Sequence, residues 1–353
     1  MNSFARRLLA WFDAHGRHDL PWQHPRSAYR VWVSEIMLQQ TRAETVIPYF
    51  QAFMARFPDV RALADAPVDE VLHLWSGLGY YARARNLHRA ARLLLECHGG
   101  ELPAERDALE ALPGIGRSTA AAILAQAFGQ PEAILDGNVR RVLARHAGID
   151  GWPGSPAVQR RLWAVAEERV PGLRMADYTQ AIMDLGATVC ARSRPECHRC
   201  PVAGDCVARA EGRVADLPTP RPVRALPVRT RWAALLSVPE GVYLERRAAS
   251  GIWGGLYSLP ERDKAGELRD WILARWPGAR QIEPPVDRIG HAFSHYRLDL
   301  RLLRFALPPA ACGIMEGEQA IWYNSRLPTR VGLPAPIERL LIEHGDSDQW
   351  REP

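Results

Sequence analysis

The feature that most constrains this chain is a group of four cysteines in one short window. Cys190, Cys197, Cys200 and Cys206 follow the spacing C-x6-C-x2-C-x5-C. We expect no secretory signal peptide, because the first residues lack a long apolar stretch followed by small residues, and disulfide frameworks belong mainly to exported proteins. The window therefore favours a metal site, and four thiolates in one compact loop suit a [4Fe–4S] cluster. We predict a [4Fe–4S] cluster loop at 190–206. Zinc or no metal are the alternatives, and zinc is the less favoured metal because zinc modules usually carry two CxxC-like pairs separated by a longer loop. Cys97 and Cys312 stand outside the window and are expected to be small buried apolar residues.

Length and composition fit a folded chain with two domains. The 353 residues include 47% hydrophobic and 24% charged residues, which are ordinary values for a globular protein. No run of about 18 uncharged apolar residues is present, so we expect no transmembrane helix. The net charge of +5 permits a polyanionic partner without requiring one. Lys264 is the only lysine among 45 basic residues, so nearly the whole chain lacks a side-chain primary amine.

The hydrophobic pattern changes along the chain. Residues 1–212 carry apolar residues at helical spacing between Pro and Gly breaks, and predict an all-helical domain that includes the cysteine loop. Residues 213–230 alternate proline with arginine and predict an extended linker. Residues 231–353 mix short alternating runs with helical segments and predict an α+β domain. Strands are expected at 232–238, 242–245 and 297–302, and helices at 263–276 and 337–344. The turn residues at 239–241 predict that the first two strands form a hairpin.

A glycine-containing turn lies between two helical segments at residues 112–120, in the string LPGIGRSTA. Gly114 and Gly116 allow a tight turn with exposed N–H groups, and Ser118 begins the next helix. These N–H groups and the helix dipole favour a phosphate at one point. The string predicts a helix-hairpin-helix that binds the DNA backbone without reading its sequence. An ordinary turn between packed helices is the alternative.

Two carboxylates stand in contrasting surroundings. Glu35 lies on the apolar side of a predicted helix, four residues after Val31 and three before Leu38, so its pKa should rise and it is a candidate general acid. A Glu at the edge of a helix that reaches solvent is the alternative. Asp136 precedes a predicted helix, where it is either an ordinary N-cap or an anion stabilised by the helix dipole. One protonated and one ionised carboxyl are what cleavage of a glycosidic bond requires.

Together these strings resemble the MutY-type adenine DNA glycosylases of the helix-hairpin-helix glycosylase superfamily. The matching segments, beside the turn and the cysteine window, are SEIMLQQTR at 34–42, GLGYYARARNL at 77–87, LDGNV at 135–139, GIWGGLY at 251–257 and FSH at 293–295. The resemblance covers nearly the whole chain. It implies an N-terminal all-α glycosylase with a [4Fe–4S] loop and a C-terminal α+β Nudix-like domain.

The resemblance also implies roles for individual residues in removing adenine mispaired with 8-oxoguanine or guanine. Glu35 would protonate adenine at N7, and Asp136, assisted by Asn138, would stabilise the sugar cation or a covalent sugar adduct. Gln40, Thr41 and Tyr80 would contact DNA, with Gln40 and Tyr80 as wedges when the base is flipped out. Judged without the resemblance, Tyr80 would be a core aromatic. The adenine pocket would be lined by Trp22, Leu38 and Asp184.

The resemblance separates this chain from lyases of the endonuclease III type. Those enzymes carry a lysine where this chain has Ser118, and the lysine amine attacks the sugar to form a Schiff base. Since no lysine precedes Lys264, a monofunctional glycosylase that uses water is implied.

The last third of the chain resembles a Nudix fold. Gly255, Glu261 and Arg269 have Nudix-box spacing, but Leu273 and Ala274 replace the metal-binding acidic pair. A recognition module is implied rather than a pyrophosphatase. Within it, three residues would recognise 8-oxoguanine, Phe293 by packing and Ser294 and His295 by hydrogen bonds. A strand end with a buried Phe is the alternative for this segment.

The expected partner is double-stranded DNA with 8-oxoguanine:adenine or guanine:adenine mispairs. We expect a monomer without membrane attachment, in the bacterial cytoplasm and associated with the nucleoid through DNA. The competing interpretations are an endonuclease III-like lyase, an inert DNA-binding scaffold and an active Nudix hydrolase.

Overall fold

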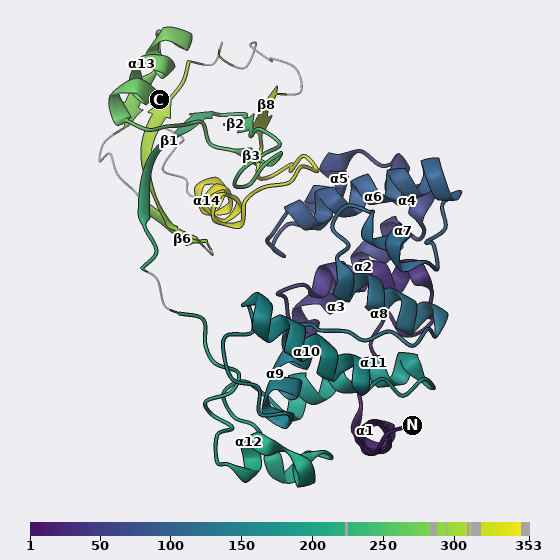
Figure 1. The fold of residues 1–353 in the computed structure, drawn as a ribbon. Coiled ribbons are helices and arrows are strands. Elements are labelled where there is room, and N and C mark those ends of the chain that lie inside the picture. The colour runs from purple at the N-terminus through teal and green to yellow at the C-terminus, as the bar shows by residue number, and fades with distance from the viewer. Residues whose placement is uncertain (223–224, 283–287, 294, 309–310, 312–318, 347–353) are drawn as a thin grey trace. The chain divides into compact units, whose positions relative to one another are not determined.

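The computed structural model describes the chain except for residues 223–224, 283–287, 294, 309–310, 312–318 and 347–353 (Figure 1). Its contacts divide the chain into two compact units. We call Met1–Asp65 with Asn86–Val223 the helical unit, and Ala66–Arg85 with Arg224–Pro353 the mixed unit. No helix in the described residues has the length and apolar composition of a membrane span. The predicted fold class, helical first and α+β second, is confirmed.

The helical unit contains α-helices joined by short loops and, near the cysteines, single turns of helix. The α-helices are α1 (Ser3–His15), α2 (Ala28–Leu38), α3 (Ala43–Arg56), α4 (Val60–Asp65), α6 (Ala82–His98, whose first turn belongs to the mixed unit), α7 (Arg106–Glu110), α8 (Arg117–Phe128), α9 (Gly137–His146), α10 (Pro156–Glu168), α11 (Met175–Asp184) and α12 (Val207–Ala210). The single turns are η1 (Leu185–Val189), η2 (Cys197–Arg199) and η3 (Ala203–Asp205).

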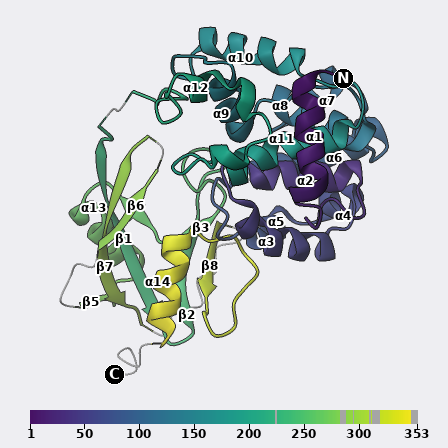
Figure 2. The ribbon, with the colours of Figure 1, turned by 90° about the horizontal axis from the view of Figure 1, so that it is seen from below.

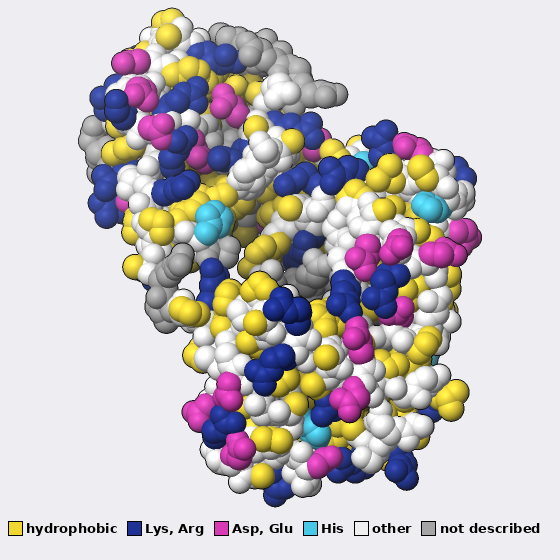
Figure 3. Space-filling model, viewed as in Figure 1, with side chains coloured by type: hydrophobic (Ala, Val, Ile, Leu, Met, Phe, Trp, Pro, Cys, Tyr) yellow, Lys and Arg dark blue, Asp and Glu magenta, His cyan; other side chains and the backbone are white. Residues whose placement is uncertain are grey.

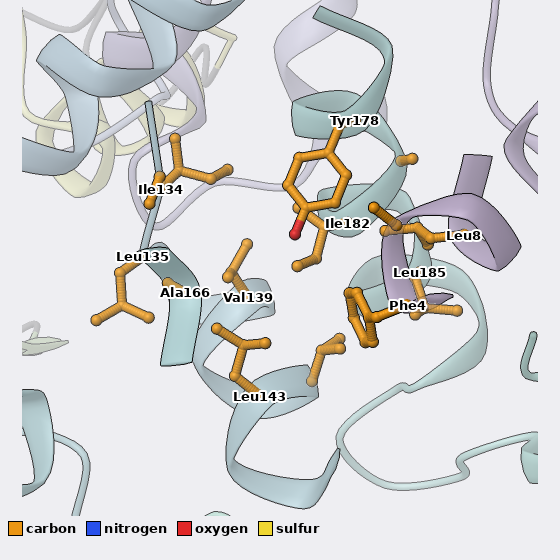
Figure 4. Packing of buried hydrophobic residues seen from close by; sticks show 14 of the residues in the cluster. Phe4, Leu8, Ile134, Leu135, Val139, Leu143, Ala166, Tyr178, Ile182 and Leu185 are labelled. Carbon is orange, nitrogen blue, oxygen red and sulfur yellow. The ribbon is translucent and has the colours of Figure 1, made fainter. Parts of the chain in front are cut away.

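The core of the helical unit is built from side chains of α1, α9 and α11 (Figure 4). Phe4 and Leu8 of α1, Val139 and Leu143 of α9, and Ile182 of α11 point toward one another and are buried. Removal of this apolar surface from water is the main stabilising contribution. The packing holds α9, which begins directly after Asp136, against α11.

Helix α8 is central to the helical unit. Residues 120–126 are all buried, and the helix packs against α2, α7 and α11. Its sequence explains this position, because small and apolar residues occupy nearly the whole circumference of the helix. It ends at Gly129, which adopts the left-handed conformation that favours glycine. Side chains of α8 therefore face α2, which carries Glu35.

The mixed unit contains an eight-stranded sheet with helices on both faces. The elements are α5 (Val68–Leu74), β1 (Val228–Val238), β2 (Gly241–Arg246), β3 (Tyr257–Ser258), β4 (Glu261–Arg262), α13 (Ala265–Arg275), β5 (Arg280–Ile282), β6 (Arg288–Ala292), β7 (Arg297–Ala306), β8 (Ala320–Tyr323) and α14 (Ala335–Asp346). Helices α13 and α14 lie on opposite faces of the sheet (Figure 2).

The sheet is organised by a long parallel pairing of β1 with β7, from Val228 beside Arg297 to Ser237 beside Ala306. β1 also pairs antiparallel with β2 across the turn at 239–240, which confirms the predicted hairpin. Residues 233–236 of β1 are all buried, as is typical of a strand covered on both faces, and Leu236 packs with Leu268 and Ile272 of α13 in one core. The predicted strands and helices of this region are all present.

Residues 66–85 pack within the mixed unit although they precede it in the sequence by more than a hundred residues. Tyr81 donates a hydrogen bond from its hydroxyl to the carbonyl of Leu333 at 2.9 Å. Arg246 of β2 forms an ion pair with Asp69 at 2.7 Å, and Arg85 donates to the carbonyl of Gly254. The helical pattern of this segment predicts its local structure but not this association.

Candidate active site and cysteine cavity

Glu35 lies on α2 with its carboxyl toward α8. Although part of the residue is accessible, burial of the carboxyl raises its pKa to about 7. Gln126 of α8 donates from its amide Nε2 to Oε1 of Glu35 at 2.9 Å, which lowers the pKa, and the charge of Asp136 raises it. The predicted rise in pKa is confirmed. A carboxyl with a pKa near 7 is a suitable general acid at neutral pH.

Asp136 is the N-cap of α9. Its Oδ1 accepts from the backbone N–H of Val139 at 2.7 Å, and its Oδ2 accepts from Nδ2 of Asn138 at 3.2 Å. Burial raises the pKa of Asp136, while the backbone N–H groups of Val139 and Asn138 and the charges of Arg141 and Arg140 lower it. The predicted N-cap is confirmed, and the N–H groups at the helix start lower the pKa as expected, but desolvation of the carboxyl outweighs them.

The two carboxyls form one site in the helical unit, because they are close enough for the charge of Asp136 to raise the pKa of Glu35. Asp136 accepts two hydrogen bonds, lies at a helix N-terminus and has two arginines nearby. Glu35 accepts a hydrogen bond from one amide. An anion is better stabilised at Asp136, so Asp136 is the stronger acid of the pair.

Asn138 connects this site to the start of the cysteine loop. Its Oδ1 accepts from Nη2 of Arg141 at 2.9 Å, and Nε of Arg141 donates to the carbonyl of Cys190 at 2.7 Å. Arg141 also donates to the carbonyl of Gly186 in η1. One guanidinium therefore joins the residue beside Asp136 to the backbone of the first cysteine.

Gly186 allows this close approach of η1 to α9. A Cβ atom there would lie 2.6 Å from Cβ and 2.9 Å from the carbonyl oxygen of Asn138. The second contact is with backbone, so a larger residue would have to displace the first turn of α9 or the η1 turn.

The glycine turn predicted at 112–120 lies between α7 and α8. Gly114 has φ +85°, and a Cβ there would lie 2.9 Å from Cβ of Asn86. Gly116 precedes α8 and provides no capping side chain, so the first N–H groups of α8 are available to a phosphate. The side chain of Ser118 is bound within the protein, because its Oγ accepts a hydrogen bond from the backbone N–H of Leu135 at 3.0 Å. This bond attaches the segment that leads into Asp136 to the first turn of α8.

Two of the predicted DNA contacts have strained backbone conformations. Gln40, after α2 in the helical unit, has φ +60°, and Tyr80, in the mixed unit, has φ +48°. Tyr80 is 51% exposed, so it is not the core aromatic that the alternative interpretation expects. Thr41 follows Gln40, and its hydroxyl donates to the carbonyl of Gln39 at 3.5 Å. Left-handed conformations in such residues are often found at functional sites.

The residues predicted to line an adenine pocket have different environments. Trp22 is buried and packs edge-to-face on Phe50, and Leu38 is half-buried at the end of α2. Asp184 is fully buried and accepts hydrogen bonds from the backbone N–H and the guanidinium of Arg17 and from Gln180. Asp184 therefore anchors the loop after α1 to α11, and its contact with adenine stays a prediction.

Cys190, Cys197, Cys200 and Cys206 line one small cavity in the helical unit. Apolar side chains and Arg145 line it as well. Nη1 of Arg145 lies 3.3 Å from Sγ of Cys190 and can stabilise a thiolate there. Burial, followed by the charges of the other three cysteines, raises the pKa of Cys200 to about 11. Four mutually interacting thiols and a nearby cation fit a metal cluster with thiolate ligands.

Two further observations concern metal ligands and cysteines. Within the described residues, no group of three or more His, Cys, Asp or Glu side chains is arranged to hold a single metal ion. Cys97 is exposed, so the expectation that it is a buried apolar residue is wrong, and Cys312 lies outside the described residues.

In the mixed unit, the FSH segment connects β6 to β7. The backbone N–H of Phe293 donates to the carbonyl of Tyr296 at 2.9 Å. The ring of Phe293 contacts those of Trp253 and His291, with centroids 5.4 and 4.5 Å apart, and that of His295 more distantly at 6.4 Å. Ser294 lies outside the described residues. An aromatic cluster therefore supports this segment.

The Nudix-box positions hold structural contacts. Glu261 pairs with Arg247 at 2.6 Å, and Arg269 donates to the side chain of Gln281 at 3.1 Å. Leu273 and Ala274 lie on α13, where Leu273 is 40% exposed.

Arginine and acidic side chains are interspersed over the visible face of each unit rather than gathered in one patch (Figure 3).

Sequence reasoning missed two residues of the site. Gln126 could have been identified from the sequence, because it is the only side-chain amide in the otherwise apolar run from Ala120 to Phe128. No sequence pattern points to Arg141, because its partners Gly186 and Cys190 are distant in the sequence.

Comparisons with known proteins agree with this architecture. Residues 33–168 match the family model described as the HhH-GPD superfamily base excision DNA repair protein, and residues 231–343 match the NUDIX domain. A thermostable thymine-DNA glycosylase is similar in structure, at 30% identity and a TM-score of 0.54, covering 59% of this chain and 95% of that chain. An endonuclease III from a non-covalent DNA complex shares the fold, at 22% identity and a TM-score of 0.50, with 59% and 94% covered. The fold and the site therefore define a base-excision DNA glycosylase of the helix-hairpin-helix superfamily.

The sequence relatives narrow this class. The adenine DNA glycosylase of Buchnera aphidicola from Acyrthosiphon pisum is 35% identical, with 96% of each chain covered. That of Rattus norvegicus is 43% identical, covering 92% of this chain and 75% of the relative. The chain belongs to the adenine DNA glycosylase family. It is a DNA N-glycosylase, a hydrolase of base excision repair whose substrate is DNA.

The contact at Gly186 leads to a first prediction. Gly186→Ala displaces the first turn of α9 and with it Asp136 and Asn138, so adenine release should slow by roughly 100-fold, the effect of a misplacement of about 1 Å. Single-turnover kinetics measure the rate, and Gly266→Ala, where a Cβ meets no atom within 4 Å, is the matched control. An unchanged rate in a folded Gly186→Ala variant would show that α9 does not depend on this contact.

Proposed function

We propose that the protein removes adenine mispaired with 8-oxoguanine or guanine, by a monofunctional hydrolysis in which Glu35 is the general acid and Asp136 stabilises the sugar cation. The observation that carries the proposal is one site with two interacting carboxyls, of which Glu35 has a pKa of about 7. The acid needs a proton at neutral pH, and the stabilising residue needs a negative charge.

The two carboxyls divide the reaction between them. Glu35 gives its proton to N7 of adenine, so the electron pair of the C1′–N9 bond leaves with a neutral base. The carboxylate of Asp136 stabilises the positive charge that develops on the sugar. A water molecule bonds to C1′ and releases a proton to solvent, and Glu35 regains a proton from solvent, which completes the hydrolysis. Asn138 orients Asp136 through the hydrogen bond to Oδ2.

Water is the nucleophile because the site holds no amine. Ser118 occupies the position of the lyase lysine, and its Oγ is bound to the backbone of Leu135. Arg140 donates from Nε to the carbonyl of Leu135, and a guanidinium remains protonated and does not form a Schiff base.

DNA binding in this proposal combines backbone contacts with base flipping. The turn at Gly114 and Gly116 and the first N–H groups of α8, including that of Ser118, hold a phosphate. Gln40 and Tyr80 insert where adenine leaves the stack, with Thr41 beside Gln40. Their left-handed backbones support these roles, because they aim side chains that are not needed for packing.

The proposal also assigns the residues that bind each base and the role of each domain. Trp22, Leu38 and Asp184 line the adenine pocket, and Phe293, Ser294 and His295 recognise 8-oxoguanine. Residues 1–212 form the catalytic domain, 213–230 a linker and 231–353 the recognition domain. The protein acts as a monomer on nucleoid DNA in the bacterial cytoplasm.

Cys190, Cys197, Cys200 and Cys206 hold a [4Fe–4S] cluster in this proposal. When bound, the cluster supplies cross-links between four thiolates and so stabilises the loop that contains them. The chain itself contributes Arg145, which donates to Cys190, and the apolar walls of the cavity, which limit access of water.

The cluster assignment predicts a brown protein. Purified protein should absorb near 400 nm, as iron–sulfur clusters do, and contain iron and acid-labile sulfide in equal amounts. Cys200→Ser should lose this absorption, whereas Cys97→Ser, at an exposed cysteine outside the cavity, should keep it. A colourless protein that carries zinc would overturn the assignment.

The general-acid role predicts a separation of chemistry from binding. Glu35→Gln removes the proton donor but no DNA contact, so adenine release should fall by a factor of about 100 to 10,000 while the affinity for a mispaired duplex stays nearly constant. Single-turnover kinetics and a binding titration on an 8-oxoguanine:adenine duplex measure both, with Glu96→Gln, an exposed residue, as the control. An equal loss of adenine release and duplex affinity, or no loss of either, would contradict the general-acid role of Glu35.

The monofunctional mechanism predicts that no covalent complex with DNA can be trapped. Borohydride reduces a Schiff base to a stable bond, so a lyase is captured on DNA, whereas this protein should release adenine and leave the strand intact. The readout is a gel of protein and DNA after reduction. A trapped complex would favour the endonuclease III-like interpretation.

A further inference from the structure

Gln126 is a buried polar residue on an otherwise apolar helix. It is 5% exposed, and residues 120–125 before it are buried and small or apolar. A side-chain amide in such surroundings is unfavourable unless it is hydrogen-bonded. Its Nε2 donates to Oε1 of Glu35 at 2.9 Å. Gln126 faces Glu35 from α8, and its burial therefore depends on this hydrogen bond.

We infer that Gln126 is a positioning residue for the general acid, which assigns the proton of Glu35 to Oε2 and holds that oxygen toward the base. A neutral carboxylic acid has one carbonyl oxygen, which accepts, and one hydroxyl, which donates. Because Gln126 donates to Oε1, Oε1 is the accepting oxygen and the proton lies on Oε2. Oε2 makes no hydrogen bond with the described part of the protein. This inference rests on the proposed role of Glu35.

The same contact affects the acidity of Glu35. Burial and the charge of Asp136 favour the neutral carboxyl, whereas an N–H donor favours the carboxylate. Without Gln126 the proton would be held more tightly and transferred less readily to adenine. Burial and Asp136 thus keep the acid protonated near neutral pH, and the contact with Gln126 keeps it able to donate.

Few polar or charged groups of the described residues surround Glu35 on the helices packed against it. Asp136 lies at the start of α9, and Arg140 and Arg141 follow it. Ser34 on α2 bonds to the carbonyl of Val31 on its own helix. Among the described residues, Gln126 is the only one whose side chain hydrogen-bonds to Glu35.

The test is a pH profile of adenine release under single-turnover conditions. Gln126→Met keeps the length of the side chain but removes the donor. The pH at which activity is half lost on the alkaline side should rise by roughly one unit, the size expected for loss of a hydrogen bond to a charged group. The rate on the acid plateau should fall several-fold, because the carboxyl is no longer oriented. Gln130→Leu, which removes an amide that bonds to the carbonyl of Ala104, should leave the midpoint unchanged.

A second measurement does not depend on activity. The pKa of the Glu35 carboxyl can be followed by NMR with labelled glutamate, with Glu35→Gln identifying the signal, and in Gln126→Met it should also rise. A midpoint and a pKa that stay in place would overturn the inference. A fall in both would overturn it too, because it would mean that the amide oxygen accepts the proton of Glu35. If Glu35→Gln itself released adenine at the normal rate, the proposed function would fail instead.

Discussion

The chemistry of this site depends on the electrostatic interaction between two carboxyls placed in one buried region. Each carboxyl alone would lose its proton at neutral pH, because the ordinary pKa of Glu or Asp lies near 4. Burial and the charge of Asp136 together raise the pKa of Glu35 to about 7, despite the opposing hydrogen bond from Gln126. Asp136 has more donors, so it carries the negative charge of the pair. A carboxyl that can hold a proton and one that favours the anion are therefore present together in the candidate site.

The surrounding structure keeps these carboxyls in place by hydrogen bonds from three directions. Ser118 binds the backbone just before Asp136, Asn138 binds its side chain, and Gln126 binds Glu35. Arg141 extends this network to the backbone of Cys190. The cysteine loop and the two carboxyls thus share a mechanical connection through one half-buried guanidinium, that of Arg141, which links the loop to the candidate site.

The local features of the sequence predicted much of this arrangement. Helical spacing identified the helices, and the period-two alternation at 297–302 identified β7, because these periodicities follow from backbone geometry. The turn residues at 239–241 identified β1 and β2 as the strands on either side. The position of Glu35 on an apolar helix side predicted its raised pKa. For Asp136 the sequence predicted the stabilising effect of the helix N-terminus, which is a local feature, but not the larger effect of desolvation, which depends on everything packed around the carboxyl. The exposed position of Cys97 was missed for the same reason.

By itself, the sequence determined the kinds of element, the cysteine window, the absence of an amine near Ser118 and the identity of the two acids. Each of these is a property of residue type and short-range spacing. Tertiary structure alone decided that residues 66–85 pack with the mixed unit, that Arg141 bonds to Cys190, and that Gln126 donates to Glu35. These contacts join residues 49 or more positions apart. No local periodicity encodes such pairs, because they result from burial of helix faces against one another.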